Sequence, residues 1–210
     1  MFNISKEELA AGIAEADAGG EIFHFKNAVA ENPSWMEFFR HLDYEAHNKN
    51  GDYPPVGNPF VERAVNGVTV KDMFYLVGAM AGRDIFVNMD NFMKYVKDAI
   101  GAEPAPVTSF VSLIGGSSSD PHYDCRRTLF WQCHGTSTFD HLASHRLDQQ
   151  HVPGNVKKTY TLEPGDLVYI GFEVPHNFYV TGPRAAITFT MSPGDGTDFQ
   201  DPNRPNNDQF

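Results

Sequence analysis

Two short segments of the sequence carry side chains that could bind one metal ion together. His122 and Asp124 are separated by a single residue in the first segment, and His176 lies in the second. On a strand, the spacing of His122 and Asp124 points both side chains to the same face. Two imidazole nitrogens and one carboxylate oxygen form the facial triad that holds Fe(II) and leaves coordination positions open. The pattern therefore indicates a metal site made of His122, Asp124 and His176.

A cation is expected to face the same pocket as this triad. Arg184 begins a segment in which alternate residues form one small, polar face and one apolar face. This pattern is typical of a strand that lines a pocket and packs its back on a core. A guanidinium fixed in this way can hold a carboxylate through two parallel hydrogen bonds. The combination suggests a cosubstrate that chelates the metal at one end and pairs with Arg184 at the other.

At these residues the sequence resembles the Fe(II)/2-oxoglutarate-dependent oxygenases. Residues 121–124, followed by 129–132 and Gly135, look like the cupin-like or JmjC-like hydroxylase branch. Residues 176–188 look like the prolyl-hydroxylase branch, in which an arginine on the last core strand binds 2-oxoglutarate. The resemblance departs from the JmjC-like asparaginyl hydroxylases at about Ser137, where those enzymes carry a cosubstrate-binding lysine.

The resemblance implies a dioxygenase that uses Fe(II), 2-oxoglutarate and O2. It would hydroxylate a protein side chain or a small molecule while 2-oxoglutarate is decarboxylated to succinate. The implied site consists of the metal ligands and catalytic residues His122, Asp124 and His176, with Arg184 and a nearby hydroxyl, Thr128 or Ser137, binding the cosubstrate.

Two other functions are compatible with the same residues. One is another metal-dependent cupin enzyme, such as a thiol dioxygenase or a sugar isomerase, although these usually rely on three or four histidines and Asp124 stands here instead. The other is a non-catalytic jelly-roll binding module whose triad is structural. Stoichiometric formation of succinate would separate both from the dioxygenase.

The elements that must position these residues change character along the chain. Residues 1–105 read as a helical N-terminal extension packed on the core, residues 106–192 as the catalytic core, and residues 193–210 as a flexible tail of one integrated domain. Short strands separated by turn residues fill the core segment. We therefore expect a mainly β fold with a helical layer, a double-stranded β-helix of the jelly-roll or cupin type.

Within the N-terminal segment, a capping box at Ser5 predicts a helix to about Ala18, and residues 21–25 form a strand candidate. Helices are further expected from Trp35, over residues 69–81 and over residues 89–100.

Strand parity predicts which core side chains face the pocket. In the segment 126–134, the even-numbered residues have the same parity as His122 and Asp124 and would face the pocket. The odd-numbered residues would face outward and lie under the helices. The inward residues are Thr128, Phe130 and Gln132, and the outward residues are Leu129, Trp131 and Cys133.

The remaining histidines carry weaker signals. His41 and His47 are expected to be surface or partly buried polar residues of the second helix. His141, His145 and His151 lie in or near a loop-like segment, and their spacing matches no common zinc site.

Composition limits the partners and the compartment. The 210 residues have a net charge of −11, which repels phosphate backbones and makes nucleic acid a poor partner. Cys125 and Cys133 would lie about 26 Å apart in a regular strand and should not form a disulfide with each other. Free cysteines, with no signal peptide or membrane-spanning stretch, predict a reduced, cytoplasmic protein.

Overall fold

The computed structural model describes residues 1–47, 60–65, 68–77, 85–113, 115–117, 121–124, 126–143, 146–147, 150–151 and 155–191. The helical elements are α1 (Lys6–Glu15), the π-helical turn η1 (Ala16–Gly20), α2 (Trp35–His47) and α3 (Met89–Ile100). The strands of the N-terminal half are β1 (Ile22–Phe25), β2 (Phe60–Val65), β3 (Val68–Val77), β4 (Pro104–Ser112) and β5 (Gly116–Ser117). The strands that follow are β6 (Arg127–His134), β7 (Ser137–Leu142), β8 (Arg146–Leu147), β9 (Gln150–His151), β10 (Val156–Leu162), β11 (Leu167–Ile170), β12 (His176–Val180) and β13 (Arg184–Met191).

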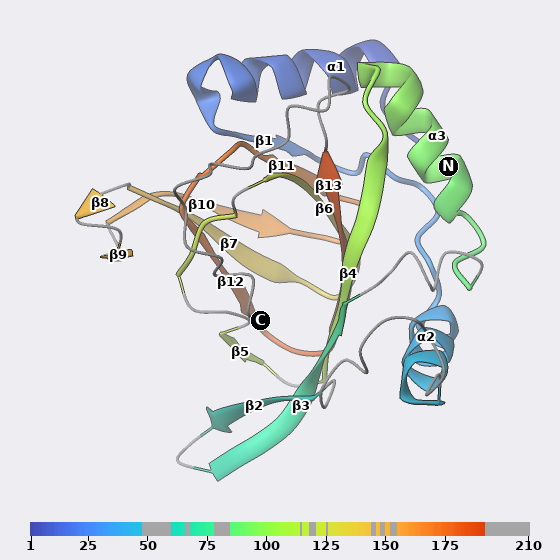
Figure 1. Ribbon diagram of the computed structural model, residues 1–210, viewed down its shortest axis with the longest axis vertical. Helices are drawn as coiled ribbons and strands as arrows, with labels where there is room; N and C mark the ends of the chain where they lie inside the picture. The colour runs from blue at the N-terminus through green and yellow to red at the C-terminus, as the bar shows by residue number, and fades with distance from the viewer. Residues whose placement is uncertain are drawn as a thin grey trace, which may run out of the picture.

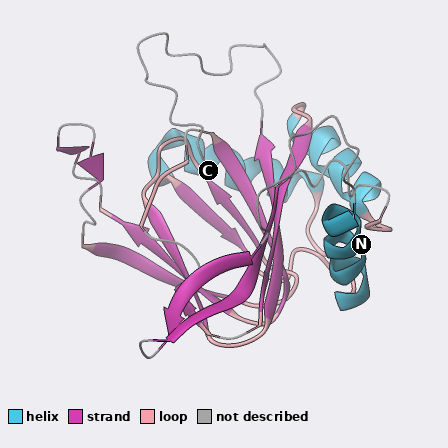
Figure 2. Ribbon diagram, turned by 60° about the horizontal axis from the view of Figure 1, so that its bottom comes forward, coloured by secondary structure: helices cyan, strands magenta, loops and turns pink. Residues whose placement is uncertain are grey.

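Strands β8 and β9 form a small sheet of their own, and the other strands form two antiparallel sheets that face each other (Figure 1 and Figure 2). The larger sheet has the order β1-β11-β6-β13-β4-β3-β2, and the smaller has the order β10-β7-β12-β5. From β4 onward the chain passes between the sheets at β4–β5, β5–β6, β6–β7, β10–β11, β11–β12 and β12–β13. This alternation is that of a double-stranded β-helix, so the expected jelly-roll or cupin fold is confirmed.

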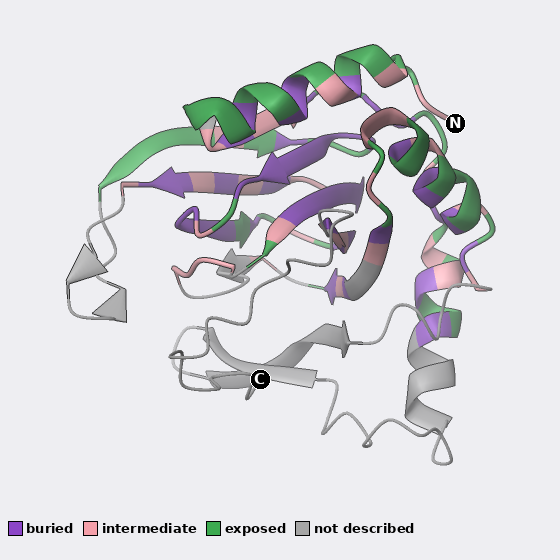
Figure 3. Ribbon diagram, turned by 45° about the horizontal axis from the view of Figure 1, so that its top comes forward, coloured by how far each residue is buried: buried purple, intermediate pink, exposed green. Residues whose placement is uncertain are grey.

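Helices α1 and α3 cover the outer face of the larger sheet (Figure 3). The capping box at Ser5 begins α1, since Ser5 Oγ accepts the Glu8 amide and the Glu8 carboxylate accepts the Ser5 amide. On α3, Phe92 stacks on Trp131 of β6 with 4.5 Å between ring centroids. Leu129, Trp131 and Cys133 all lie in this outer core, as strand parity predicted.

A second core fills the space between the sheets. It contains Phe130, Phe139 and Phe178, and the ring centroids of Phe130 and Phe178 are 4.5 Å apart. Ala186 lies in this inner core while Ala185 and Ile187 lie in the outer one, so both faces of β13 agree with the predicted alternation. The inner core thus lies between the two sheets, next to the residues predicted to form the site.

One predicted helix is wrong. Residues 69–81 were expected to form a helix, but β3 (Val68–Val77) is a strand paired with β2 on one side and β4 on the other. The segment 1–105 therefore supplies β1, β2 and β3 to the larger sheet in addition to its helices. Long-range pairing, which a local pattern does not report, decided this element.

Some sequence predictions lie outside the described residues. They concern the tail 193–210, Cys125 and His145, and the side chains of His47 and His151 are likewise not described. Cys133 is a buried free thiol, as expected. Among the residues that the structure describes, none of the helices has both the length and the apolar character needed to cross a membrane.

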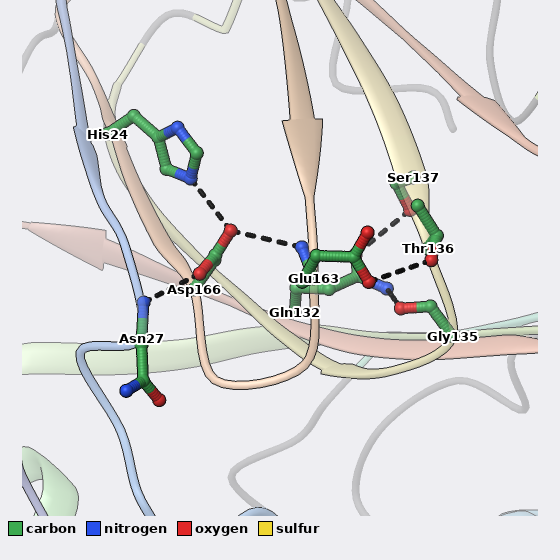
Figure 4. Close-up of polar contacts among 8 residues, drawn as sticks. All are labelled: His24, Asn27, Gln132, Gly135, Thr136, Ser137, Glu163 and Asp166. Atoms are coloured by element: carbon green, nitrogen blue, oxygen red, sulfur yellow. Dashed lines mark hydrogen bonds and ion pairs between the residues drawn. The ribbon is translucent and has the colours of Figure 1, made fainter.

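The turn before β11 is fixed by the buried carboxylate of Asp166 (Figure 4). Its oxygens accept the amides of Asn27 and Glu163 at 2.7 and 3.0 Å, and His24 Nε2 lies 2.8 Å from Oδ2. Burial alone would raise the pKa of Asp166, but these hydrogen bonds outweigh it and leave the pKa below its ordinary value. The carboxylate therefore ties β1 to the turn between β10 and β11.

Replacing Asp166 by asparagine is expected to destabilise the fold by about 1–3 kcal/mol at pH 7, because a buried donor loses its acceptor. When the pKa of a carboxyl group is lower in the folded than in the unfolded state, the ionised group stabilises the folded protein at pH values above the unfolded-state pKa. This contribution is lost as the pH falls through the folded-state pKa. The difference in the free energy of unfolding between wild type and Asp166→Asn should thus stay constant down to about pH 4 and become smaller below it. Urea unfolding across this range tests it, with Glu163→Gln as the exposed control. An undiminished difference at pH 2 would contradict the role of ionised Asp166.

Candidate metal and cosubstrate site

His122 and His176 lie side by side at one end of the smaller sheet. Their backbones form an isolated antiparallel bridge, with N–O distances of 3.0 Å from His122 to His176 and 2.7 Å in reverse. The two ring centroids are 4.4 Å apart. Pro175 contributes to this arrangement, because a proline favours an extended conformation in the residue before it, here Val174, and so leads the chain into β12. The fold thus brings together two residues that are far apart in the sequence.

The His176 ring is oriented for ligation through one nitrogen. Its Nδ1 lies 2.9 Å from the carbonyl oxygen of Val174, which can only accept, so Nδ1 carries the proton and Nε2 keeps the lone pair. Burial lowers the pKa of His176 to about 4, and the charge of His122 acts in the same direction against that of Asp124. The imidazole is therefore neutral near pH 7, which is the form that binds metal ions.

The carboxylate of Asp124 is held by a neighbouring hydroxyl. Thr128 Oγ1 donates to Asp124 Oδ2 at 3.0 Å, and the Asp124 carbonyl oxygen accepts the Glu173 amide at 3.1 Å. Thr128 is buried and was predicted as a possible cosubstrate contact; the structure places its hydroxyl on Asp124. A hydrogen bond of this kind orients a ligating carboxylate.

The three side chains are of types that bind a metal ion, although they are not gathered around one point. Two imidazoles and one carboxylate are the ligand types of the facial triad. Within the described part of the chain, however, no three His, Cys, Asp or Glu side chains already stand close enough together to hold an ion. The structure therefore places His122 and His176 side by side and shows Asp124 held by Thr128. Metal binding by these three residues is a prediction.

Arg184 is buried at the start of β13, with 1% of its surface exposed. Its guanidinium carbon lies 5.4 Å from the ring centroid of Phe110 and 5.9 Å from that of Phe130. The turn between β6 and β7 passes close to it, because a side chain at Gly135 would collide with the Pro183 carbonyl and approach the Arg184 Cα. Gly135 also has a φ of +65°, so glycine is required there on both counts. The cation predicted from the sequence thus lies in an aromatic-lined interior.

Ser137, the second predicted cosubstrate contact, belongs to a buried amide network (Figure 4). Its Oγ donates to Gln132 Oε1 at 2.9 Å, and Gln132 Nε2 donates to the carbonyl oxygens of His134 and Gly135 at 2.7 and 2.8 Å. Ser137 therefore lies just beyond the glycine turn that abuts Arg184. Its one hydroxyl proton is used in this network, whereas a carboxylate of 2-oxoglutarate can only accept a hydrogen bond.

Sequence reasoning missed the position of His141. This residue is on β7, not in the loop-like segment, and it is the register partner of His176. Its Nε2 lies 2.8 Å from the Glu21 carboxylate, which is also 2.7 Å from Lys157 Nζ. His41, expected to be a surface or partly buried polar residue, is fully buried, and its Nδ1 lies 3.1 Å from Ser109 Oγ. No local pattern in the sequence links Glu21 to His141.

No protein-family model matches the sequence, and no curated protein is significantly similar to it. Solved structures are similar in fold. The Escherichia coli ribosomal oxygenase YcfD superposes with a TM-score of 0.57 at 15% sequence identity, covering 88% of this chain and 56% of that one. A structure of YcfD with cobalt and 2-oxoglutarate superposes with a TM-score of 0.50 at 14% identity and the same coverage.

The chain shares its fold with YcfD. The likeness confirms the double-stranded β-helix fold that the sequence predicted. This chain spans little more than half the length of YcfD. At this level of identity the likeness establishes the double-stranded β-helix, and the chemistry of its site must be argued from the residues.

Proposed function

We propose that the protein is an Fe(II)- and 2-oxoglutarate-dependent dioxygenase that hydroxylates a protein side chain or a small molecule. His122, Asp124 and His176 would hold the metal, and Arg184 would bind the distal carboxylate of 2-oxoglutarate. O2 would be the second cosubstrate, and succinate and CO2 the coproducts. The neighbour's complex with cobalt and 2-oxoglutarate supports the choice of metal and cosubstrate.

The observation that carries the proposal is that a pair of histidine side chains and a buried arginine side chain lie in the same barrel. The paired imidazoles of His122 and His176 lie at the start of β12, and the buried guanidinium of Arg184 begins the next strand. Strand β12, five residues long, spans roughly 13 Å between its first and last Cα atoms. The long, flexible side chain of Arg184 and a short dicarboxylate bound to the metal can together span a distance of this size.

Each residue has a distinct task in this scheme. The bound metal would supply the oxidative chemistry, while the protein binds, orients and excludes water. Thr128 holds Asp124 in place, and the Val174 carbonyl fixes the tautomer of His176. Arg184 would orient the dicarboxylate through two charge-assisted hydrogen bonds, and Phe130, Phe139 and Phe178 would keep the cavity dry.

The neighbour is described as a ribosomal oxygenase, which agrees with a protein side chain as the target. With a net charge of −11, we propose that binding to nucleic acid is weak.

One observation favours a second candidate, a cupin enzyme with three histidine ligands. His141 is directly opposite His176 in the sheet and offers a third imidazole next to the proposed triad. The position of His141 Nε2, 2.8 Å from the Glu21 carboxylate, argues against it, because that nitrogen lies next to a residue outside the proposed triad. The two candidates differ in whether 2-oxoglutarate is consumed.

Measuring succinate formation tests the proposal. Anaerobically reconstituted Fe(II) protein should show a metal-to-ligand charge-transfer band with 2-oxoglutarate, and admission of O2 should yield succinate even without a primary substrate. His122→Ala and Arg184→Ala proteins serve as controls for adventitious iron. Absence of the band at millimolar 2-oxoglutarate in the wild type would overturn the dioxygenase and leave the three-histidine cupin.

A further inference from the structure

Ser112 faces the interior of the barrel beside Arg184. It is the last residue of β4 and the direct register partner of Arg184, which begins β13. Residues directly opposite each other in antiparallel strands point to the same face, with Cβ atoms about 4.5–5.5 Å apart. The preceding residue, Val111, lies in the outer core. Phe110 has the parity of Ser112, and its ring centroid lies 5.4 Å from the guanidinium carbon of Arg184. Ser112 and this guanidinium therefore border the same interior space.

The hydroxyl of Ser112 is a buried donor that its surroundings do not use. The side chain is fully buried, and among the residues that the structure describes, Ser112 Oγ has no hydrogen-bond partner. Burying a hydroxyl without a hydrogen bond costs free energy, so such groups are rare in folded proteins and each calls for an explanation. Thr128 and Ser137, the hydroxyls considered from the sequence, both donate to other side chains. Ser112 therefore offers the interior a donor that a ligand can take up.

The ligand group that fits a guanidinium and a hydroxyl side by side is a carboxylate. A guanidinium can only donate hydrogen bonds, and a serine hydroxyl has one proton to donate. A carboxylate accepts through two oxygens with about four lone-pair positions, so it can take both bonds of a guanidinium fork and one more from a hydroxyl. A hydrogen bond to this charged acceptor is also stronger than one to a neutral group. Arg184 and Ser112, opposite each other in the sheet, thus suit one end of a dicarboxylate.

We propose that Ser112 donates a hydrogen bond to the distal carboxylate of 2-oxoglutarate. The inference rests on the proposed function, which supplies this ligand and the contact of its distal carboxylate with Arg184. It assigns the cosubstrate hydroxyl to β4, whereas the sequence motifs pointed to Thr128 or Ser137. Ser112 would be a specificity-determining residue, because its hydrogen bond forms only with a 2-oxo acid that carries a carboxylate at its far end. In the unliganded protein the same buried hydroxyl lowers the stability of the fold.

A matched pair of 2-oxo acids tests this contact. 2-Oxoglutarate and 2-oxopentanoate have the same chelating end and the same chain length, but the second has a methyl group in place of the distal carboxylate. Each is titrated anaerobically into the Fe(II) forms of wild type and Ser112→Ala, and the charge-transfer band gives the affinity. The variant should bind 2-oxoglutarate about 10- to 100-fold more weakly, as expected for the loss of one hydrogen bond to a charged group. Its affinity for 2-oxopentanoate should equal that of wild type.

The stability of the unliganded protein separates a ligand contact from a structural hydroxyl. Ser112→Ala should have a urea midpoint equal to or above that of wild type, because the change removes a buried group that lacks a hydrogen bond. Ser109→Ala is the matched control, since Ser109 is a buried serine of the same strand on the opposite face, with its Oγ 3.1 Å from His41 Nδ1. This control should lower the urea midpoint and leave the affinity for 2-oxoglutarate unchanged.

Each contrary result has a distinct meaning. Equal affinity of wild type and Ser112→Ala for 2-oxoglutarate would overturn the inference and leave the proposed function intact. An equal loss of affinity for both acids would also overturn it, because Ser112 would then act on the chelating end or on the shape of the cavity. So would a lower urea midpoint in Ser112→Ala, which would make its hydroxyl a structural group. If wild type shows no charge-transfer band with millimolar 2-oxoglutarate, the proposed function fails first and the inference falls with it.

Discussion

His122→Ala, Asp124→Ala and His176→Ala should each lose Fe(II) and Mn(II) binding by more than about 100-fold. Each change removes one of the three proposed protein ligands, and the loss of an outer partner alone commonly weakens metal binding 10- to 100-fold. The folded structure should persist, because both hydrophobic cores are built from other residues. Isothermal titration with Mn(II) and thermal unfolding of each variant provide the two measurements.

Two further variants sharpen this result. Thr128→Val removes the hydrogen bond to Asp124 while keeping the side-chain shape, and should weaken Mn(II) binding by roughly 10- to 100-fold. His134→Gln removes an imidazole that stacks on Trp35 of α2, with ring centroids 4.8 Å apart, and should leave the affinity unchanged. Wild-type affinity in any of the three alanine variants would exclude that residue from the ligand set.

Arg184→Ala should weaken 2-oxoglutarate binding by about ten- to a hundredfold or more. Charge-assisted hydrogen bonds contribute roughly 1.5–3 kcal/mol each, and about 1.4 kcal/mol corresponds to a tenfold change. Metal affinity should barely change, because Arg184 is not a ligand in the proposed site. Arg184→Lys should recover only part of the loss, since an ammonium group cannot reproduce the guanidinium fork. The charge-transfer band of the anaerobic Fe(II) complex, titrated with 2-oxoglutarate, gives the affinities.

Arg127→Ala is the matched control for this loss. Arg127 is one-third exposed and forms an ion pair with Asp17 at 3.2 Å, so removing it deletes a guanidinium without touching the interior. Each Arg184 variant should be checked by urea unfolding, because a buried side chain is being truncated. If folded Arg184→Ala binds 2-oxoglutarate as tightly as wild type, the anchor lies elsewhere, and Ser137 becomes the next residue to test.

The sequence was informative wherever a strand's own alternation decided the outcome. The two faces of β6 and β13 could be read from parity, because one face of each strand packs under the helices and the other lines the barrel. The neighbourhood of His122 and His176 was predictable only through the fold, since their backbone bridge joins distant segments.

Other features depended on contacts that no local pattern encodes. The segment of β3 contains polar and apolar residues that suit a helix as well as a strand, and its pairing with β2 and β4 decided between them. The contact of Glu21 with His141 likewise joins the residue before β1 to β7 in the other sheet. Such pairs become visible only when the two sheets are placed relative to each other.

Strand β1 has a consequence for how this chain can be handled. It pairs along β11, whose four residues are all buried, and in the described part of the molecule it forms the border of the larger sheet. A protein shortened past Phe25 would leave the backbone donors and acceptors of β11 open beside an apolar surface. Unprotected strands of this kind recruit a second molecule and nucleate aggregation. Residues 22–25 therefore cover the edge of β11 and reduce self-association, and any shortened version of the protein must keep them.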